Sequence, residues 1–573
     1  MKSKRLSKAK RLSLDIITTL PQPIIETILC LLPIREAART SILSRDWRYK
    51  WTTIPKLVFS TPDANPIMET SKLIRAIHQV ISLRQDPIHE FTLSLHGNCF
   101  GKTGLPSCEV DQILCHLSKN HPVNKLILDF GASSDDCSYN LPFSVFSSLH
   151  RLTELYLSWC DLDHQPAFNG FGSLVVLSLD FVWISRKTLL CLLSSCPSLK
   201  SFRLIMPEDH VVGRENSTMI ELFQCLPLIE HLTIWCDTIW WFVPDLVPQE
   251  LPTSLIHLKY FCMEQMSFHH GYALTFLAIL IKNSPNLEKI ELQIDAAHYL
   301  FNDTDYDSDV YEEYHSDVWL EHLSNVWLEH LIELKITDFS NLEPELEFVK
   351  LILAKSPKLK KVSIKSVVKR DQEPGMLKTL LRTPRVSAVE IDVLMFKDHV
   401  VGRDEKSTMT ELFECLPVIE HLTIWSEISP WFVPDLVPRD LPTSLIHLKY
   451  FRFEQMSFHD GYALTFLAVL IKSSPNLEKI ELEIDDPDLY EKYHSDVWLE
   501  HLSNVWLEHL IELKIRDFSN LEPELEFVKL ILAKSPKLKK VSIKCVVKKD
   551  QEPGMLKTLL RTPRVSAVEI DVV

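Results

Sequence analysis

Residues 152–162 read LTELYLSWCDL, with apolar side chains at Leu152, Leu155, Leu157, Cys160 and Leu162. The alternation of apolar and polar residues around Leu155 and Leu157 predicts a short strand with one buried face. A unit of this size has too little core to fold alone, so we expect it to be stacked on similar units.

The spacing of residues 152–162 is that of a leucine-rich repeat, and looser versions follow each other at steps of mostly 22 to 35 residues. Steps of this length leave room for one short strand and one short helix each. The alternative is a doubly wound fold, but no glycine-rich turn follows any expected strand, and glycine is only 12 of 573 residues. The repeats begin at Ile88, Val123, Leu152, Leu174, Leu199, Ile229, Leu255, Leu287, Leu331, Leu359, Val386, Ile419, Leu445, Leu477, Leu510, Leu538 and Val565.

Three helices of these repeats can be located by apolar residues at helical spacing, namely 273–284, 346–356 and 376–383. Each is followed at once by a proline, which cannot continue a helix. We therefore expect an α/β solenoid with an irregular strand-plus-helix repeat.

The second half of the chain repeats part of the first. Residues 342–365 are identical to 521–544, and residues 371–393 are identical to 550–572. The step from Val386 to Ile419 across the boundary between the copies is 33 residues, so the copies are expected to continue one solenoid. The identity is compatible with recent tandem copying or with the joining of two neighbouring gene pieces.

The charge of the chain excludes one class of partner. The formal net charge is −16, and six of the first eleven residues are basic, so the remaining body is more acidic still. Because nucleic-acid binding depends on displacing counterions with Lys and Arg, no nucleic-acid partner is expected. The basic tail 1–11 is expected to be a solvated disordered segment, and an import signal is the alternative.

Apolar stretches and cysteines indicate a location. The longest apolar runs are far shorter than the ~20 residues of a membrane span, and no secretory leader is recognisable. The 13 cysteines contain no C-x-x-C pair, which suggests free thiols in a reducing compartment. We expect no membrane association and a place in the nucleus, the cytoplasm or both.

An amino-terminal module follows the basic tail. Pro23 suits the first turn of a helix ending near Leu32 before Pro33, a second helix is expected over 35–43, and Ser44 can cap a third. The first helix carries apolar residues on more than one face. A unit of about forty residues cannot bury all of them, so part of this surface must meet a partner.

The module resembles the F-box of plant proteins in its Leu20–Pro21 pair, the run 24–33, the stretch 37–44 and its tryptophans Trp47 and Trp51. Asp46 departs from the family, which usually has Lys or Arg there. With the repeats and the tails, the chain resembles the F-box/FBD/leucine-rich-repeat family, although it has two FBD-like segments instead of one. The resemblance implies a basic tail (1–11), a three-helix F-box (12–55), leucine-rich repeats (56–330), an FBD-like segment (331–393), duplicated repeats (398–509) and a second FBD-like segment (510–573).

The resemblance implies a non-catalytic substrate-recognition subunit of an SCF-type cullin-RING ubiquitin ligase. The F-box would bind a Skp-type adaptor, and through it the cullin and RING subunits, while the repeats would hold an unidentified target protein. The alternative is a leucine-rich-repeat binding or scaffold protein that does not assemble into a ligase. Carried over to this sequence, the adaptor contacts are Leu20, Pro21, Ile24, Ile28, Leu29, Leu32, Pro33, Ile42, Leu43, Trp47 and Trp51.

Target contacts are expected on the strands, at positions between the buried aliphatic residues, because these face away from the helices. Exposed aromatic residues with few charges suit a protein-binding hot spot, although ordinary strand surface is the alternative. The positions selected are Tyr156, Ser158, Asp180, His231, Trp235, His257, Phe261 and Trp425.

Catalytic and metal-binding patterns are missing from the sequence. The best metal candidate alternates Asp303, Asp305, Asp307 and Asp309, but the twelfth position of a calcium loop would be Tyr314 and not glutamate. A solvated acidic loop is favoured. We therefore expect no catalytic residue, no cofactor and no metal.

Overall fold

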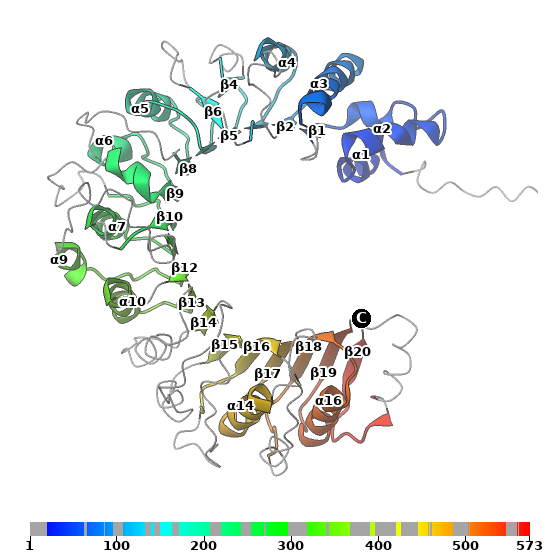
Figure 1. The fold of residues 1–573 in the computed structure, drawn as a ribbon, viewed down its shortest axis with the longest axis vertical. Helices are drawn as coiled ribbons and strands as arrows, with labels where there is room; N and C mark the ends of the chain where they lie inside the picture. The colour runs from blue at the N-terminus through cyan, green and yellow to red at the C-terminus, as the bar shows by residue number, and fades with distance from the viewer. Residues whose placement is uncertain are drawn as a thin grey trace, which may run out of the picture. The chain divides into compact units, whose positions relative to one another are not determined.

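The computed structural model places the chain in two compact units, residues 1–247 and 248–573 (Figure 1). Each unit is built mainly from parallel strands with helices on one face of the sheet. The structure describes residues 20–61, 66–84, 86–95, 107–131, 139–142, 149–162, 171–206, 219–241, 254–268, 271–295, 318–339, 343–366, 390–395, 420–425, 445–456, 458, 461–484, 502, 505–545, 559 and 561–572.

Unit 1 begins with the small helical module. It contains α1 (Gln22–Cys30), α2 (Ile34–Arg39), and two 3₁₀ helices, η1 (Thr40–Ile42) and η2 (Lys50–Thr53). The expected third helix is thus only turns followed by η2. Its start at Ser44 is a local turn, in which the Ser44 hydroxyl accepts a hydrogen bond from the Trp47 backbone N–H at 3.4 Å. This is the contact of the expected N-cap, but turns and the 3₁₀ helix η2 follow it in place of a regular helix.

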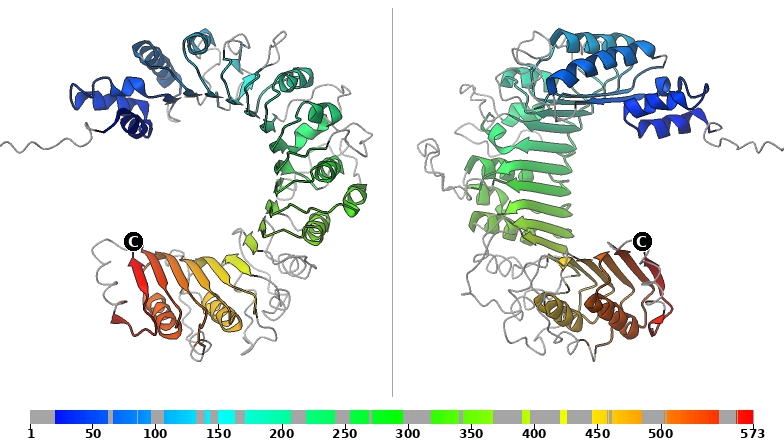
Figure 2. Two further views of the ribbon diagram at one scale, coloured as in Figure 1. Left: turned by 180° about the vertical axis from the view of Figure 1, so that it is seen from behind. Right: turned by 45° about the vertical axis from the view of Figure 1, so that its right-hand side comes forward.

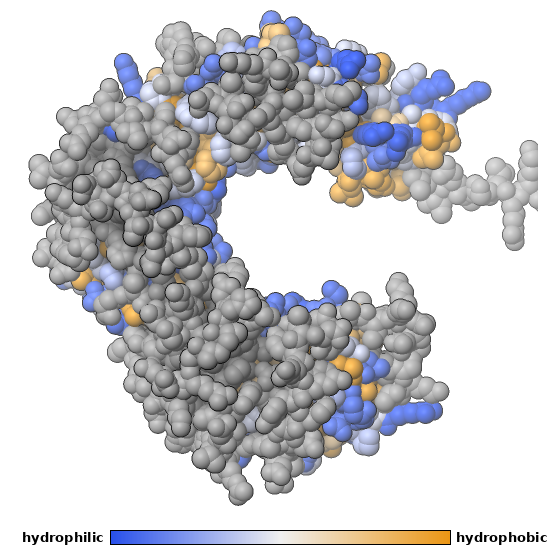
Figure 3. Space-filling model, viewed as in Figure 1, coloured by the Kyte–Doolittle hydropathy of each residue, from blue (hydrophilic) through white to orange (hydrophobic). Residues whose placement is uncertain are grey.

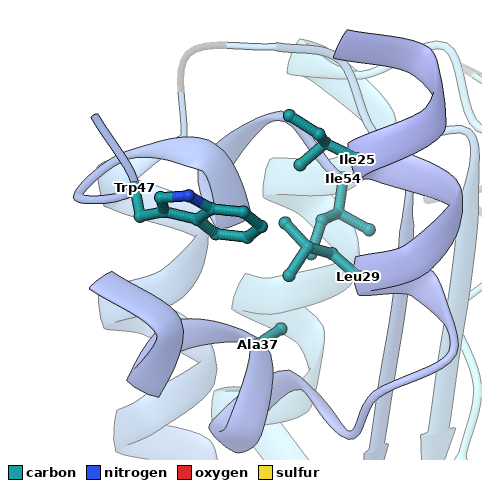
Figure 4. Packing of buried hydrophobic residues seen from close by; sticks show 5 residues of the cluster. All are labelled: Ile25, Leu29, Ala37, Trp47 and Ile54. Carbon is teal, nitrogen blue, oxygen red and sulfur yellow. The ribbon is translucent and has the colours of Figure 1, made fainter. Parts of the chain in front are cut away.

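The core of this module is one apolar cluster. Ile25, Leu29, Ala37, Trp47 and Ile54 point toward one another and are almost fully buried (Figure 4). The two α1 residues are four apart and so share one face of the helix. The packing of α1, α2 and η2 around the Trp47 ring therefore fixes the module.

The sheet of unit 1 runs β1–β2–β3–β5–β7–β8–β9, and all of these strands are parallel. In β5 the predicted residues Leu155 and Leu157 are buried, and Leu155 lies between Leu126 and Leu177 of the adjacent strands. β1 precedes the first predicted repeat and caps the sheet. The strands are β1 (Lys56–Ser60), β2 (Glu90–Ser94), β3 (Lys125–Asp129), β5 (Glu154–Ser158), β7 (Val176–Asp180), β8 (Ser201–Ile205) and β9 (His231–Trp235), beside the short pair β4 (Tyr139–Asn140) and β6 (Cys160–Asp161).

The helices of unit 1 follow the strands in the order that the repeat spacing predicts. They are α3 (Pro66–Leu83), α4 (Ser107–Asn120), α5 (Arg186–Ser194), α6 (Met219–Gln224) and the 3₁₀ helix η4 (Cys236–Trp241).

Unit 2 contains the parallel strands β10 to β20 in chain order, and their pairing continues across the boundary between the sequence copies. Ile391 of β14 pairs with Leu422 of β15, which in turn pairs with Phe451 of β16. The strands are β10 (Tyr260–Met266), β11 (Lys289–Ile294), β12 (Glu333–Phe339), β13 (Lys361–Ser366), β14 (Glu390–Met395), β15 (His421–Trp425), β16 (Tyr450–Met456), β17 (Lys479–Ile484), β18 (Glu512–Phe518), β19 (Lys540–Cys545) and β20 (Glu569–Val572).

Two of the three predicted helices are present in unit 2 as α7 (Gly271–Asn283) and α10 (Glu343–Lys355), each ending just before its proline. The predicted helix 376–383 lies outside the described residues. The other helices of this unit are α9 (Val318–Ser324), α14 (Gly461–Ser473) and α16 (Glu522–Lys534). In Figure 2 the strands of each unit lie side by side, and the expected α/β solenoid is confirmed.

The strand phase of β10 differs from the prediction. Phe261 pairs with Ile290 of β11 and is fully buried, so it cannot face a target. The repeat therefore starts at Leu258, not at Leu255. Both leucines precede the strand and both are buried, so the apolar spacing alone allowed a shift of three residues.

Candidate functional site

The helical module of unit 1 exposes large apolar side chains. Ile42 is 85% exposed, Leu31 81% and Leu43 68%, in a module whose own core is already filled. In Figure 3 apolar residues gather on this part of the surface. Exposed apolar area of this density typically marks a protein-binding surface.

This surface follows from the order of apolar residues in α1. Ile25 and Leu29 turn inward, while Ile24 and Ile28, also four residues apart, lie on an exposed face of the same helix. The helix ends at Cys30, because Pro33, the N-cap of α2, cannot continue it. The intervening Leu31 consequently projects outward from the turn between the helices.

Polar contacts hold α1 against η2. The Gln22 side chain donates to the Thr53 hydroxyl at 2.9 Å and accepts from the Lys50 ammonium group. These bonds fix the relative position of the helix and the 3₁₀ turn. The exposed apolar side chains are therefore presented by a rigid support.

The structure divides the predicted adaptor contacts into three groups. Leu29 and Trp47 lie in the core, and Leu20 and Trp51 are half-buried against it, so these four support the surface from inside. Seven are exposed: Pro21, Ile24, Ile28, Leu32, Pro33, Ile42 and Leu43. We name these seven, together with Leu31 and Tyr49, the apolar docking surface.

Leu31 and Tyr49 were not selected from the sequence, although the structure exposes both of them. Leu31 continues the apolar run from Ile28, and Tyr49 is 62% exposed between the two tryptophans of the module. Their positions next to predicted contacts were the available signal.

The sheet of each unit has one face that the helices do not cover, which we name the open face. In unit 1, Lys125 and Glu154 form an ion pair at 2.6 Å, and the Tyr156 hydroxyl donates to Glu154 at 3.1 Å. Burial, followed by the charge of Glu154, raises the pKa of Tyr156. The predicted residue Asp180 is paired with Arg203 at 3.0 Å.

Four half-buried aromatic side chains lie at the carboxyl ends of strands β5, β7 and β9. The rings of Trp159 and Phe181 are stacked with centroids 4.5 Å apart, Trp183 lies 6.3 Å from Trp159, and Trp235 meets Phe181 edge-on at 5.2 Å. We name Trp159, Phe181, Trp183 and Trp235 the aromatic row.

The backbone at Trp159 and Phe181 is left-handed, with φ of 57° and 54°. Bulky residues are rare in this region, and each costs of order 1 kcal/mol or more there. Further along the chain, Gln265 and Asp338 take the same conformation at the ends of their strands. Because polar residues suffice for this turn, the two aromatic rings are not required by the backbone.

The open face of unit 2 is dominated by acid–base pairs. Glu291 accepts from the Tyr260 hydroxyl at 3.0 Å and pairs with the ammonium groups of Lys289 and Lys335. Burial opposes ionisation of Glu291, but the hydrogen bond and charge of Lys335 lower its pKa below the ordinary value.

The second copy repeats this arrangement and adds charge. Glu481 pairs with Lys514 at 3.0 Å and with Arg516 at 2.6 Å, while Glu483 lies 3.4 Å from Arg452 and 3.3 Å from Arg516. Burial opposes ionisation of Glu481, and the hydrogen bond and charge of Lys514 lower its pKa.

The predicted target contacts are distributed over both units. Tyr156, Ser158, Asp180 and Trp235 are half-buried on β5, β7 and β9 of unit 1. His231 is exposed at the start of β9, and His257 is exposed before β10, while Phe261 is core. Trp425 ends β15, and its side chain lies outside the described part. The positions selected from the sequence thus include Trp235 of the aromatic row but not Trp159, Phe181 or Trp183, which lie beyond the ends of β5 and β7.

Metal ligands do not gather anywhere in the described ranges, where no group of three or more His, Cys, Asp or Glu has suitable geometry. The acidic run Asp303 to Asp309 lies outside these ranges. None of the helices that the structure describes is long and apolar enough to cross a membrane.

Two kinds of comparison place the chain in a class of repeat proteins with an F-box. The family model of the At1g61320/AtMIF1 LRR domain matches residues 88–212. The chain is 30% identical over 425 residues to the F-box/FBD/LRR-repeat protein At1g13570 of Arabidopsis thaliana. This match covers 65% of this chain and 96% of the relative.

Two further relatives from Arabidopsis thaliana match shorter parts. The F-box/FBD/LRR-repeat protein At2g04230 is 32% identical over 40% of this chain and 49% of its own length, and the FBD-associated F-box protein At5g56370 is 32% identical over 35% and 45%. The solved structure of the TLR13–ssRNA13 complex is similar over 87% of this chain and 62% of the TLR13 complex chain. The sequence identity is 13% and the TM-score is 0.38. The chain belongs to the plant F-box/FBD/leucine-rich-repeat family, and neither the family model nor these relatives bears the name of an enzyme.

Proposed function

We propose that the protein is the substrate-recognition subunit of an SCF-type ubiquitin ligase. The apolar docking surface binds a Skp-type adaptor, which connects to the cullin and RING subunits, and the open face of the repeats binds a target protein. The observation that carries this proposal is the exposure of Ile42, Leu31 and Leu43 on a module with a filled core of its own.

The subunit itself catalyses nothing in this scheme. It acts by proximity: holding a target near the charged conjugating enzyme raises the effective concentration of the target lysines. The reaction requires only two binding surfaces and a rigid connection between them. The proposed site of action is the nucleus or the cytoplasm, where cullin-based ligases work.

The proposal is tested by co-purifying the full chain with a Skp-type adaptor, for the wild type and for a Leu32→Asp plus Leu43→Asp variant. Both residues are exposed, so these substitutions test docking and leave the core intact. The matched control is Ile446→Asp, an isoleucine of unit 2 that is 50% exposed. We expect adaptor recovery to be lost only in the double variant.

Substitutions of Leu29 or Trp47 are unsuitable for this test, because these side chains belong to the core and their loss would unfold the module. If the wild type recovers no adaptor while its repeats are folded, the second candidate stands, a leucine-rich-repeat scaffold outside any ligase. The ion-paired open faces are compatible with either role. Equal recovery by the wild type and the double variant contradicts the docking assignment.

A further inference from the structure

The aromatic row differs from the rest of the open face in lacking charge on its own side chains. Trp159, Phe181, Trp183 and Trp235 form a chain of ring contacts that extends over β5, β7 and β9. Elsewhere on the open faces, the rings of Tyr156 and Tyr260 are each already covered by a lysine. The ammonium group of Lys125 lies 5.0 Å from the ring centre of Tyr156, and that of Lys289 lies 5.7 Å from the ring centre of Tyr260. No such ammonium is recorded over the row within the described residues.

The indole N–H of Trp235 is a second unusual feature. It is shielded from solvent and has no hydrogen-bond acceptor in the part of the chain that the structure describes. Buried donors are normally paired, and an unpaired one in a native protein calls for an explanation. An acceptor on a bound segment would supply the missing bond after a small turn of the ring.

Acidic residues end three of the strands beside the row. The strands β3, β6 and β7 each finish with an aspartate, namely Asp129, Asp161 and Asp180. The strands β5 to β9 contain one Lys or Arg residue, Arg203 of β8, and it is paired with Asp180. An aromatic surface bordered by carboxylates attracts a cation, because the ring faces are negative as well.

We infer that the aromatic row is the place where the target is held, and that it binds an arginine or lysine side chain on an extended segment of the target protein. The inference rests on the proposed receptor function and names the chemistry of its ligand. The cation lies on the indole faces of the row, and the aspartates at the strand ends supply long-range attraction. The ion-paired face of unit 2 is left for less specific contacts.

The test uses the full chain and a library of random linear 12-residue peptides. Wild-type protein is expected to enrich peptides with Arg or Lys at one fixed position. An enriched peptide in which citrulline, the neutral isostere of arginine, replaces that residue should bind at least tenfold more weakly. Enrichment without a cationic position, unchanged binding of the citrulline peptide, or no enrichment at all overturns the inference.

Two variants connect the peptide to the row. Trp159→Asn removes the ring but suits the left-handed backbone, since asparagine tolerates positive φ, so the fold is expected to survive as judged by circular dichroism. It should lose at least tenfold in peptide affinity. The control Trp327→Ala removes an exposed tryptophan that already lies under Lys355, and it should bind as wild type. Equal affinities for wild type and Trp159→Asn overturn the inference.

Adaptor co-purification of the same preparations separates this inference from the proposed function. Adaptor binding without a cationic preference among peptides refutes the inference alone. A cationic preference that depends on Trp159, without adaptor binding, refutes the ligase role and leaves the binding site in place.

Discussion

Replacing Ile42 by alanine measures how much the apolar docking surface contributes to adaptor binding. The change removes three carbon atoms, each worth about 0.8 kcal/mol when transferred from water. Since Ile42 is 85% exposed in the free protein, nearly all of this is available on docking. We expect a loss of about 2 kcal/mol of binding free energy, or a roughly 30-fold higher Kd.

The same exposure predicts that the fold is unaffected. Ile42 is not part of the core cluster, so the free energy of unfolding should stay within about 0.5 kcal/mol of wild type. Leu29→Ala provides the contrast, because Leu29 is 1% exposed and its truncation leaves a cavity that costs about 2–5 kcal/mol. That variant should lose adaptor binding together with its structure.

The assay is calorimetric titration of a purified Skp-type adaptor into the full chain, with urea unfolding of each variant alongside. Ile446→Ala is the surface control, since this isoleucine is 50% exposed in unit 2 and should leave Kd unchanged. A wild-type Kd for Ile42→Ala would refute the reasoning. So would an equal weakening by Ile446→Ala, which would indicate non-specific apolar adhesion.

Three further experiments test other parts of the structure. Burial raises the pKa of Glu524 from 4.5 to about 7, although backbone hydrogen bonds to its carboxylate oppose this shift, so between these pH values the folded state binds one more proton than the unfolded state. The free energy of unfolding should therefore fall by about 3 kcal/mol as the pH rises through this range. Urea unfolding of Glu524→Gln at several pH values should lack this pH-dependent loss. A double-mutant cycle of Glu483→Gln with Arg516→Thr should give a coupling free energy of about 0.5–1 kcal/mol in the stability of the fold. If the effects of the two substitutions are strictly additive, the ion pair at 3.3 Å does not contribute to stability. In urea unfolding, Phe261→Ala should lower the free energy of unfolding by about 3–5 kcal/mol because Phe261 is buried, and Tyr260→Phe should lower it by only about 1 kcal/mol, because it removes one hydrogen bond to Glu291. The reversed order would favour the strand phase predicted from the sequence, in which Phe261 faces outward.

The strands could be predicted from the sequence because a strand with one buried face has apolar residues at alternate positions. Leu155 and Leu157 are an example, and both are buried as predicted. The phase of β10 could not be predicted in the same way. Leu255 and Leu258 both fit the start of a repeat, and only the pairing of Phe261 with Ile290 of the next strand decides between them.

The candidate site was predictable only in part, for two physical reasons. In α1 apolar residues occupy several faces, so periodicity does not tell the buried Leu29 from the exposed Ile28. At the ends of β5 and β7 the two-residue alternation stops, and the left-handed turns at Trp159 and Phe181 depend on the neighbouring strands. Sequence patterns therefore describe the repeats better than the places where the repeats end.

The two sequence copies in unit 2 show where the repeats tolerate change. At the buried positions 263 and 279 the exchanges stay apolar, from Met263 to Phe453 and from Ile279 to Val469, whereas the buried Cys262 is replaced by Arg452. On the open face three neutral residues become charged: Cys262, Gln293 and Thr337 correspond to Arg452, Glu483 and Arg516.

These three new charges lie on adjacent strands and pair with each other through the Glu483 carboxylate, at 3.4 and 3.3 Å. Arg452 and Arg516 also pair with Glu454 and Glu481, at 2.6 Å each, and the first copy carries both acids as Glu264 and Glu291. Only Glu483, introduced alone, would have left an unpaired charge on a partly buried face, which is unfavourable. Together they replace three neutral side chains by a set of paired charges, which adds to the acid–base pairs that both copies share. The copies therefore share a fold but present chemically different open faces, and a ligand that recognises the open face of one copy should not bind the other equally.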